Sequence, residues 1–575
     1  MYKTILSHVG KYKKEATLSP VMIVGEVAME VLIPKVMGMI IDSGIKKGNI
    51  GYVVKMGALM VLMALFSLVF GALAARFSAI AAMGFAKNLR KSLFGKVQGF
   101  SFANVDKFST ASLTTRLTTD VTNIQNAFMM FIRMAFRSPI MLICATVMAV
   151  NQNARLSLVF LIAIPVLGTA VFLIISNAHP RFKKMLEKYD GMNGRIQENL
   201  VGIRVVKAFA REEYEKKRFS ENTEDVRRAQ FAAEKLVILS MPIMQLTMYA
   251  SIVSILFFGG HMAVKGDIST GELTSFIMYV SQILMSLMML SFLFIMFVIS
   301  RASLQRVYEV LTEEPTIVSP EGSDVSAADG SVRFENVSFS YYGDMKNLAL
   351  DGIDLDIRSG ETIGIIGGTG SSKTSLVQLI PRLYDATAGK VIVGGHDVRD
   401  YSTDTLRDQV AMVLQKNVLF SGTIKDNLRW GNENATDEEI IDACQSACAH
   451  DFIMGFPKGY DTDLGQGGVN VSGGQKQRLC IARALLKKPK IIILDDSTSA
   501  VDTATDSSIR KAFREKLADT TTIIIAQRIT SVMDADRIVV MDNGRITDIG
   551  THDELMQSSV IYREVYDSQQ KGADE

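Results

Sequence analysis

The chain has 575 residues, of which 48% are hydrophobic and 21% are charged. This length exceeds one ordinary domain, and the composition suits a protein that is partly embedded in a membrane and partly soluble. The net charge of +2 gives no electrostatic basis for binding nucleic acid. We expect the four cysteines to be reduced and mostly buried, because they form no CxxC pair and cytosolic disulfides are rare.

Six apolar runs, each close to the roughly 20 residues that cross a bilayer, occupy the first 300 residues. They lie at about 18–41, 56–79, 130–150, 156–177, 238–262 and 273–299. The gaps after the second and fourth runs are long, rich in Lys and Arg, and helical in their apolar spacing. The excess of positive charge predicts that these gaps and both chain ends are cytosolic, so the membrane helices should continue beyond the bilayer.

The second half of the chain has a different pattern. Prolines and glycine interrupt the segment after the sixth run, and from about residue 331 apolar strands alternate with helical stretches. The sequence therefore predicts a transmembrane domain at 1–305, a connector at 306–330 and a nucleotide-binding domain at 331–575. Four runs predict a parallel sheet, namely Thr362–Ile366, Ile491–Leu494, Thr521–Ile525 and Ile538–Met541.

A glycine-rich segment between a predicted strand and a helical run has the features of a phosphate-binding loop. It consists of Gly367, Gly368, Thr369, Gly370, Ser371, Ser372, Lys373 and Thr374. Glycines let backbone amides point at phosphate oxygens, Lys373 would reach the β- and γ-phosphates, and Thr374 would hold Mg²⁺. Position 372 is usually glycine in this motif, so the serine leaves the local backbone geometry open. A chance glycine-rich turn is the alternative for the segment taken alone.

Further motifs follow in a fixed order. Gln415 comes after an apolar strand. A helix containing Gln477 and Arg478 then opens with Ser472, Gly473, Gly474 and Gln475. Asp495 ends a further apolar strand, in a position suited to Mg²⁺. This set resembles the ATP-binding cassette (ABC) family, and the six-span half resembles its exporters. The resemblance implies a membrane α-helical domain with six transmembrane helices and long cytosolic extensions, followed by an α/β P-loop ATP-binding cassette domain. It also implies ATP and Mg²⁺ as cofactors.

The resemblance assigns roles to individual residues. In this family two cassettes sandwich two ATP molecules, each between the phosphate loop of one cassette and the signature motif of the other. Tyr341 would stack on adenine, with its neighbour Tyr342 as the alternative. Thr374, Gln415 and Asp495 would hold the metal. The segment Ser499–Asp502 matches the loop that contacts the opposite cassette, with Asp502 as its acidic residue.

Two positions depart from the family pattern in the catalytic centre. Asp496 replaces a glutamate that polarises the attacking water, and Gln527 replaces the switch histidine. A shorter carboxylate is retracted from the proton it must take, and glutamine has no titratable proton. The sequence thus resembles the degenerate-site subunit of bacterial heterodimeric exporters, as does the run Gln466–Asn470 before the signature. A slow, self-sufficient homodimeric exporter and a nucleotide-gated channel are the alternatives.

The expected partners are a second, non-identical half-transporter with an efficient catalytic site, the lipid membrane, and an exported amphipathic drug, lipid or peptide. The expected location is the bacterial plasma membrane. Glu26 and Glu30, one helical turn apart in the first span, predict either a cation-attracting wall of the cargo cavity or a structural pair with Lys35 or with Arg133 and Arg137.

Two cytosolic segments resemble the short helices that dock into the cassettes in this class of exporter. They are Thr110–Leu113 in the first long gap and Glu198–Phe209 in the second.

Overall fold

The computed structural model describes residues 1–320, 322–496, 502–517 and 519–571. These residues form two compact units. The first unit contains Met1–Gln98 and Thr110–Glu313, and the second contains Gly99–Ser109 and the chain from Glu314 onward.

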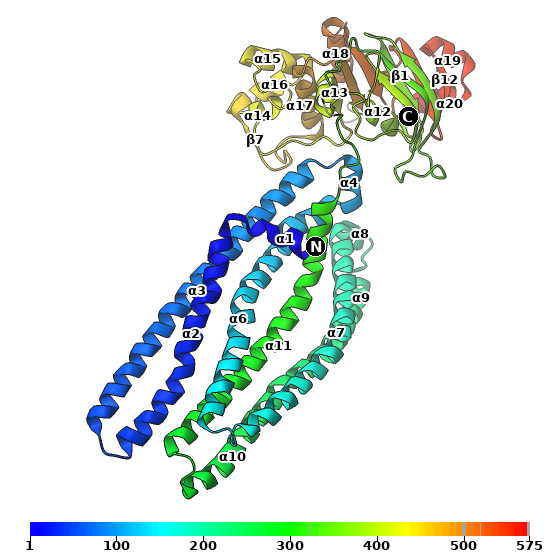
Figure 1. Ribbon diagram of the computed structural model, residues 1–575. Coiled ribbons are helices and arrows are strands. Elements are labelled where there is room, and N and C mark those ends of the chain that lie inside the picture. The colour runs from blue at the N-terminus through cyan, green and yellow to red at the C-terminus, as the bar shows by residue number, and fades with distance from the viewer. Residues whose placement is uncertain (321, 497–501, 518, 572–575) are drawn as a thin grey trace. The chain divides into compact units, whose positions relative to one another are not determined.

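The described residues of the first unit are arranged as helices joined by short connections (Figure 1). The helices are α1 (Tyr2–Leu6), η1 (Ser7–Tyr12), α2 (Lys13–Met39), η2 (Ile40–Ile45), α3 (Ile50–Gln98), α5 (Thr110–Thr115), η3 (Arg116–Asp120), α6 (Val121–Gln152), α7 (Leu158–Val201), α8 (Ile203–Ala208), α9 (Glu212–Ile238), α10 (Ser240–Lys265) and α11 (Thr270–Thr312). Among the described residues, six helical segments are long and apolar enough to cross a membrane. The predicted transmembrane architecture is therefore confirmed.

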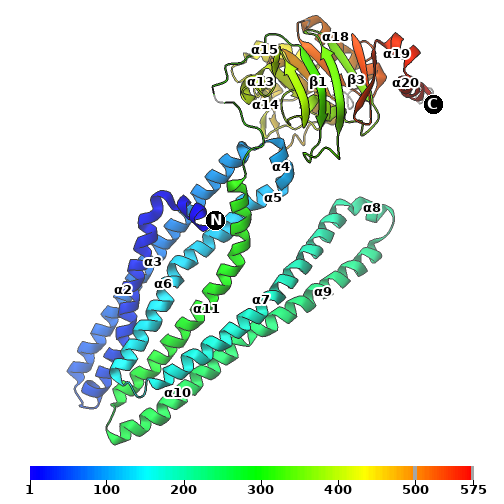
Figure 2. The same ribbon diagram turned by 45° about the vertical axis from the view of Figure 1, so that its right-hand side comes forward.

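Several of these helices are much longer than a bilayer requires. Helix α3 has 49 residues and α7 has 44. At 1.5 Å per residue they are roughly 74 and 66 Å long, about twice the thickness of the hydrocarbon core. The helices thus extend beyond the bilayer, as the apolar spacing of the long gaps predicts. Figures 1 and 2 both show α9 running alongside α7 over this extension.

A charged cluster joins α2 to α6 inside the first unit. Arg137 of α6 donates hydrogen bonds to Glu26 and, at 2.9 Å, to both carboxylate oxygens of Glu30. Lys35 and Arg133, the other partners considered from the sequence, are exposed. Because an unpaired charge within a membrane is costly, this pairing supports a structural role for the two carboxylates.

We expect Arg137→Met to lower the thermal stability and the yield of folded protein, because it leaves two carboxylates without a counter-charge. Removing one partner of a buried ion pair costs about 3–5 kcal/mol. Adding Glu26→Gln and Glu30→Gln to Arg137→Met should restore much of the loss, whereas Arg133→Met is the matched control at an exposed position. Equal melting temperatures for Arg137→Met and Arg133→Met would contradict a structural role for the cluster.

The second unit is built on two larger sheets and a short two-stranded one. The strands are β1 (Val332–Phe339), β2 (Leu350–Ile357), β3 (Thr362–Gly367), β4 (Ala388–Val393), β5 (His396–Asp397), β6 (Val410–Val413), β7 (Gly422–Thr423), β8 (Asp463–Leu464), β9 (Ile491–Asp495), β10 (Thr521–Ile525), β11 (Arg537–Asp542) and β12 (Arg545–Gly550). The helices are α4 (Phe102–Phe108), α12 (Lys373–Gln378), α13 (Thr403–Gln409), α14 (Ile424–Leu428), α15 (Asp437–Ser446), α16 (His450–Met454), η4 (Gly459–Asp461), α17 (Gly473–Leu486), α18 (Thr503–Lys516), η5 (Ile529–Ser531), α19 (His552–Ser558) and α20 (Val560–Lys571).

The six-stranded sheet has the order β12-β11-β3-β10-β9-β6. All of its pairs are parallel except β11 with β12. All four predicted strands lie in this sheet, so the predicted parallel arrangement is confirmed. The antiparallel sheet β2-β1-β4-β5 was not predicted from the apolar runs, because its strands alternate polar and apolar residues.

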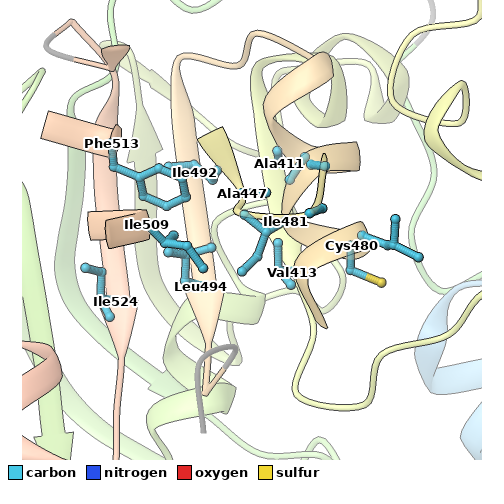
Figure 3. Close-up of a cluster of buried hydrophobic side chains, with 14 of the residues drawn as sticks. Ala411, Val413, Ala447, Cys480, Ile481, Ile492, Leu494, Ile509, Phe513 and Ile524 are labelled. Carbon is cyan, nitrogen blue, oxygen red and sulfur yellow. The ribbon is translucent and has the colours of Figure 1, made fainter. Parts of the chain in front are cut away.

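The side chains of β9 show that the six-stranded sheet is buried on both faces. Ile492 and Leu494 belong to one hydrophobic cluster, and Ile491 and Ile493 belong to another. Successive side chains of a strand point to opposite faces, so a continuous apolar run serves two cores at once. Figure 3 shows the first cluster, where Ile492 and Leu494 lie near side chains of α17 and α18, including Ile481, Ile509 and Phe513.

Helix α4 belongs to the second unit even though it precedes the third membrane span. The hydroxyl of Tyr384 donates a 2.6 Å hydrogen bond to Asp106 of α4. The Asn104 side chain bonds to the backbone of Glu314 and Thr316 at 3.0 and 3.1 Å. The predicted docking segment Thr110–Leu113 belongs to the first unit, whereas α4, which directly precedes it, belongs to the second. Helix α4 has only 7 residues, so a search for apolar runs of membrane-spanning length could not identify it.

Candidate nucleotide-binding site

The parallel sheet brings four separate motifs to one edge. Strand β3 leads into the glycine-rich loop, β9 ends at Asp495, and β6 and β10 end two residues before Gln415 and Gln527, respectively. These four strands are neighbours, and the carboxyl ends of parallel strands lie at the same edge, where α/β sheets bind ligands. Residues more than 150 positions apart in the chain thus line one site.

The glycine-rich loop has the form of a phosphate cradle. The Nζ of Lys373 donates to the carbonyl oxygens of Gly367 and Gly368 at 2.8 Å and to the hydroxyl of Ser371 at 3.2 Å. A side chain at Gly368 or Gly370 would meet open space, whereas one at Gly367 would come within 2.2 Å of a backbone oxygen. Burial lowers the pKa of Lys373, while the nearby carboxylates oppose that shift. The open backbone and the lysine fit the phosphates of a nucleotide.

Ser372 adopts the conformation that glycine usually provides in this loop. Its φ of 68° and ψ of 25° lie in the left-handed region. The backbone geometry that the sequence left open is thus the glycine-like one, held by an L-residue. This conformation costs a non-glycine residue about 1–2 kcal/mol.

We expect Ser372→Gly to raise the free energy of unfolding of this domain. Relief of backbone strain contributes about 1–2 kcal/mol, and the greater chain entropy of glycine in the unfolded state costs roughly 0.5–1 kcal/mol. The net gain should therefore be at most about 1.5 kcal/mol. Ser372→Ala is the control, because it removes the hydroxyl and keeps the Cβ. The midpoint of thermal unfolding is measured on both purified variants, and equal shifts for glycine and alanine would contradict backbone strain.

Hard oxygen donors suited to Mg²⁺ lie beside the loop. The hydroxyl of Thr374 donates a 2.9 Å hydrogen bond to Asp495, whose side chain is buried. Burial raises the pKa of Asp495. Within the described residues, no three His, Cys, Asp or Glu side chains could hold a metal ion together. Mg²⁺ is commonly bound through one or two protein groups together with substrate phosphates, and Thr374 and Asp495 are groups of that kind.

Thr374, Asp495 and the amide oxygen of Gln415 would hold the ion. When bound, it neutralises charge on the phosphates.

Asp496 is held by two amide side chains. Its Oδ2 accepts hydrogen bonds from Gln527 at 2.8 Å and from Gln415 at 3.4 Å. The Asp496 backbone has a φ of 48°, and its carbonyl accepts from Gln477 at 3.2 Å. Burial raises the pKa of the Asp496 carboxyl, against the effect of these donors. Gln527 and Asp496, both departures from the family pattern, therefore contact each other directly.

The two tyrosines considered for adenine differ in their surroundings. Tyr341 is 46% exposed and Tyr342 is 86% exposed. The hydroxyls of Tyr341 and Ser375 lie 2.8 Å apart, which ties Tyr341 to the helix that follows the phosphate loop. These contacts favour Tyr341 as the platform for the base.

Tyr384 was not identified from the sequence, because no local pattern marks it. Its ring lies 5.2 Å from that of Tyr341, and its hydroxyl bonds to Asp106. Burial raises the pKa of Tyr384, and Asp106 raises it further. Tyr384 connects α4 to the predicted adenine platform.

The remaining predicted residues lie at helix starts. Ser472 caps α17, with its hydroxyl accepting from the Gln475 amide and the Gln475 side chain accepting from the Ser472 amide. Asp502 caps α18 through Thr505. The other residues of the predicted loop, Ser499–Val501, lie outside the described residues.

Comparisons with known proteins agree with this architecture. A family model described as the ABC transporter transmembrane region matches residues 17–301, and the model described as ABC transporter matches residues 350–499. The chain is 37% identical to an uncharacterized ABC transporter ATP-binding protein of Bacillus subtilis, YfiB, over 98% of each chain. The chain belongs to the ABC transporter family.

Two further comparisons place this ABC transporter among relatives. It is 32% identical to an ATP-dependent lipid A-core flippase of Syntrophus aciditrophicus, over 84% of this chain and 80% of the flippase. A solved bacterial Atm1-family ABC exporter with ATP bound superposes with a TM-score of 0.82 at 23% identity, covering 97% of this chain and 98% of that chain. The chain is thus an integral membrane protein with the exporter fold and an ATP-hydrolysing cassette.

Proposed function

We propose that this ABC transporter is the degenerate-site subunit of a heterodimeric exporter, in which the partner's site performs most of the ATP hydrolysis. The observation that carries the proposal is the 2.8 Å hydrogen bond between Gln527 and Asp496. It joins the two catalytic positions at which this chain departs from the family pattern.

The chemistry of this contact disfavours hydrolysis. A general base must reach the attacking water within about 2.6–3.2 Å, and the aspartate is one methylene shorter than glutamate. Oδ2 of Asp496 is also already occupied by two amide donors. Gln527 can donate a hydrogen bond to a phosphate oxygen, but it cannot transfer a proton.

Nucleotide binding, in contrast, has the groups it needs. The glycine loop, Lys373 and the Thr374–Asp495 pair fit Mg-ATP, and the contact of Tyr341 with Ser375 supports Tyr341 as the proposed platform for the base. We therefore propose a site that binds ATP and hydrolyses it slowly. The signature residues Ser472, Gly473, Gly474 and Gln475 would complete the partner's site, and Asp502 would contact the opposite cassette.

The proposed cargo is an amphipathic drug, lipid or peptide moved outward across the bacterial plasma membrane, with both chain ends cytosolic. The similarity to an ATP-dependent lipid A-core flippase supports a lipid among these classes. Glu26 and Glu30 could also attract cationic cargo, because two carboxylates face one guanidinium. Their bonds to Arg137 make the structural role the primary one in this proposal.

We expect Gly474→Asp nearly to abolish the ATPase activity of the assembled pump, whereas Asp496→Asn should lower it only a few-fold. A side chain at Gly474 would obstruct the grip of the signature on the partner-bound γ-phosphate. Oriented donors at developing charge are worth roughly 10²–10³ in rate. Steady-state ATPase assays of the two purified variants, with assembly checked by size-exclusion chromatography, measure the difference.

The same pair of variants tests the alternative, a slow homodimeric exporter. A homodimer has two identical sites, so both substitutions would be severe, and comparable collapse of both variants would rule out the asymmetric arrangement. The wild-type chain purified alone should then also hydrolyse ATP at the rate of the full pump.

A further inference from the structure

The residues Ala526–Ile529, which include Gln527 at the switch position, are called the switch segment. This segment directly follows the end of β10 in the six-stranded sheet. The amide of Ala526 still bonds to the backbone of Ile365 in β3, at 3.2 Å. Three residues after Ala526, at Ile529, the chain enters the short helix η5. The backbone that carries Gln527 therefore needs partners from outside the sheet.

One side chain of the C-terminal helix supplies these partners. The Nε2 of Gln569 in α20 donates to the Gln527 carbonyl oxygen at 2.7 Å. The Oε1 of Gln569 accepts from the Ile529 amide at 2.9 Å. A glutamine amide offers one acceptor and two donors, so Gln569 takes the place that a neighbouring strand would fill.

Helix α20 is itself firmly placed. Tyr562 is fully buried, and its hydroxyl lies 2.8 Å from Nδ1 of His552 in α19. Ile561, Val565 and Tyr566 pack against the same hydrophobic cluster that includes Ile529. Gln569 thus projects from a helix anchored on the core that supports the switch segment.

We propose that Gln569 is a positioning residue that fixes the switch segment so that Gln527 remains directed at Asp496 and at the γ-phosphate position. Gln569 fixes the backbone on both sides of Arg528, and Gln527 then reaches Asp496 at 2.8 Å. The part of this inference that concerns retained ATP rests on the proposed function. The part that concerns backbone order does not.

The first test is hydrogen–deuterium exchange on the assembled, nucleotide-free pump. Gln569→Met keeps the side-chain volume and loses both hydrogen bonds, and Gln570→Met changes an exposed neighbour on the same helix. We expect exchange in peptides covering residues 527–531 to rise about 3- to 10-fold in Gln569→Met, the size expected for loss of one or two hydrogen bonds. Equal exchange in the two variants would overturn the proposal.

The second test is release of labelled Mg-ATP from this chain's site in the same proteins. We expect release about 3- to 10-fold faster in Gln569→Met than in wild type or Gln570→Met. Gln569→Glu should not restore wild-type release, because it keeps the acceptor for Ile529 but sets a carboxylate against the Gln527 carbonyl.

The two tests distinguish a failure of the degenerate-site function from a failure of the positioning role of Gln569. Rapid hydrolysis at this site in the wild type would refute the degenerate-site function and leave the exchange result intact. Retention of ATP in the wild type and equally in Gln569→Met would overturn the positioning role.

Discussion

The register of three parallel strands is the constraint on which the nucleotide site depends. In the ladders of β10 with β3 and β9, Ile525 pairs with Ile365 on one side and with Asp495 on the other. This alignment puts the start of the glycine loop, the magnesium-site carboxylate and Gln527 at one level of the sheet edge. A slip of one residue would turn every side chain of a strand to the opposite face, so the apolar runs that fill both cores also fix the site.

The same edge of the sheet holds Asp496 and Gln527, the two residues on which the proposed loss of hydrolysis rests. Asp496 and Gln527 lie beyond the ends of their strands. The Asp496 amide still bonds to the backbone of β10, and the Gln527 carbonyl accepts from Gln569. The loop that would bind phosphate keeps its geometry even at Ser372, which accepts a left-handed conformation in place of glycine. In the proposed function, binding and hydrolysis separate because the groups for binding are retained, whereas Asp496 and Gln527 are bonded to each other.

Much of this architecture could be predicted from the sequence, because its signals are strong and local. Apolar runs of bilayer length predicted six spans, and continuous apolar strands predicted the parallel sheet. Contacts formed by single side chains between distant elements were not predictable. Gln569 and Tyr384 carry no motif, and their roles arise only when α20 meets the switch segment and α4 meets the cassette. Arg137 was one of several basic residues in reach of Glu26 and Glu30, and only the packing of α2 against α6 selects it.

The central claim is that this chain's own site holds ATP while the partner's site turns it over. The most direct measurement follows the assembled pump through turnover with photoactivatable, γ-labelled ATP, crosslinks the bound nucleotide, separates the two chains and identifies the nucleotide on each. We expect intact ATP on this chain after many partner turnovers, with ADP accumulating on the partner. ADP on this chain, formed and exchanged at the partner's rate, would contradict it.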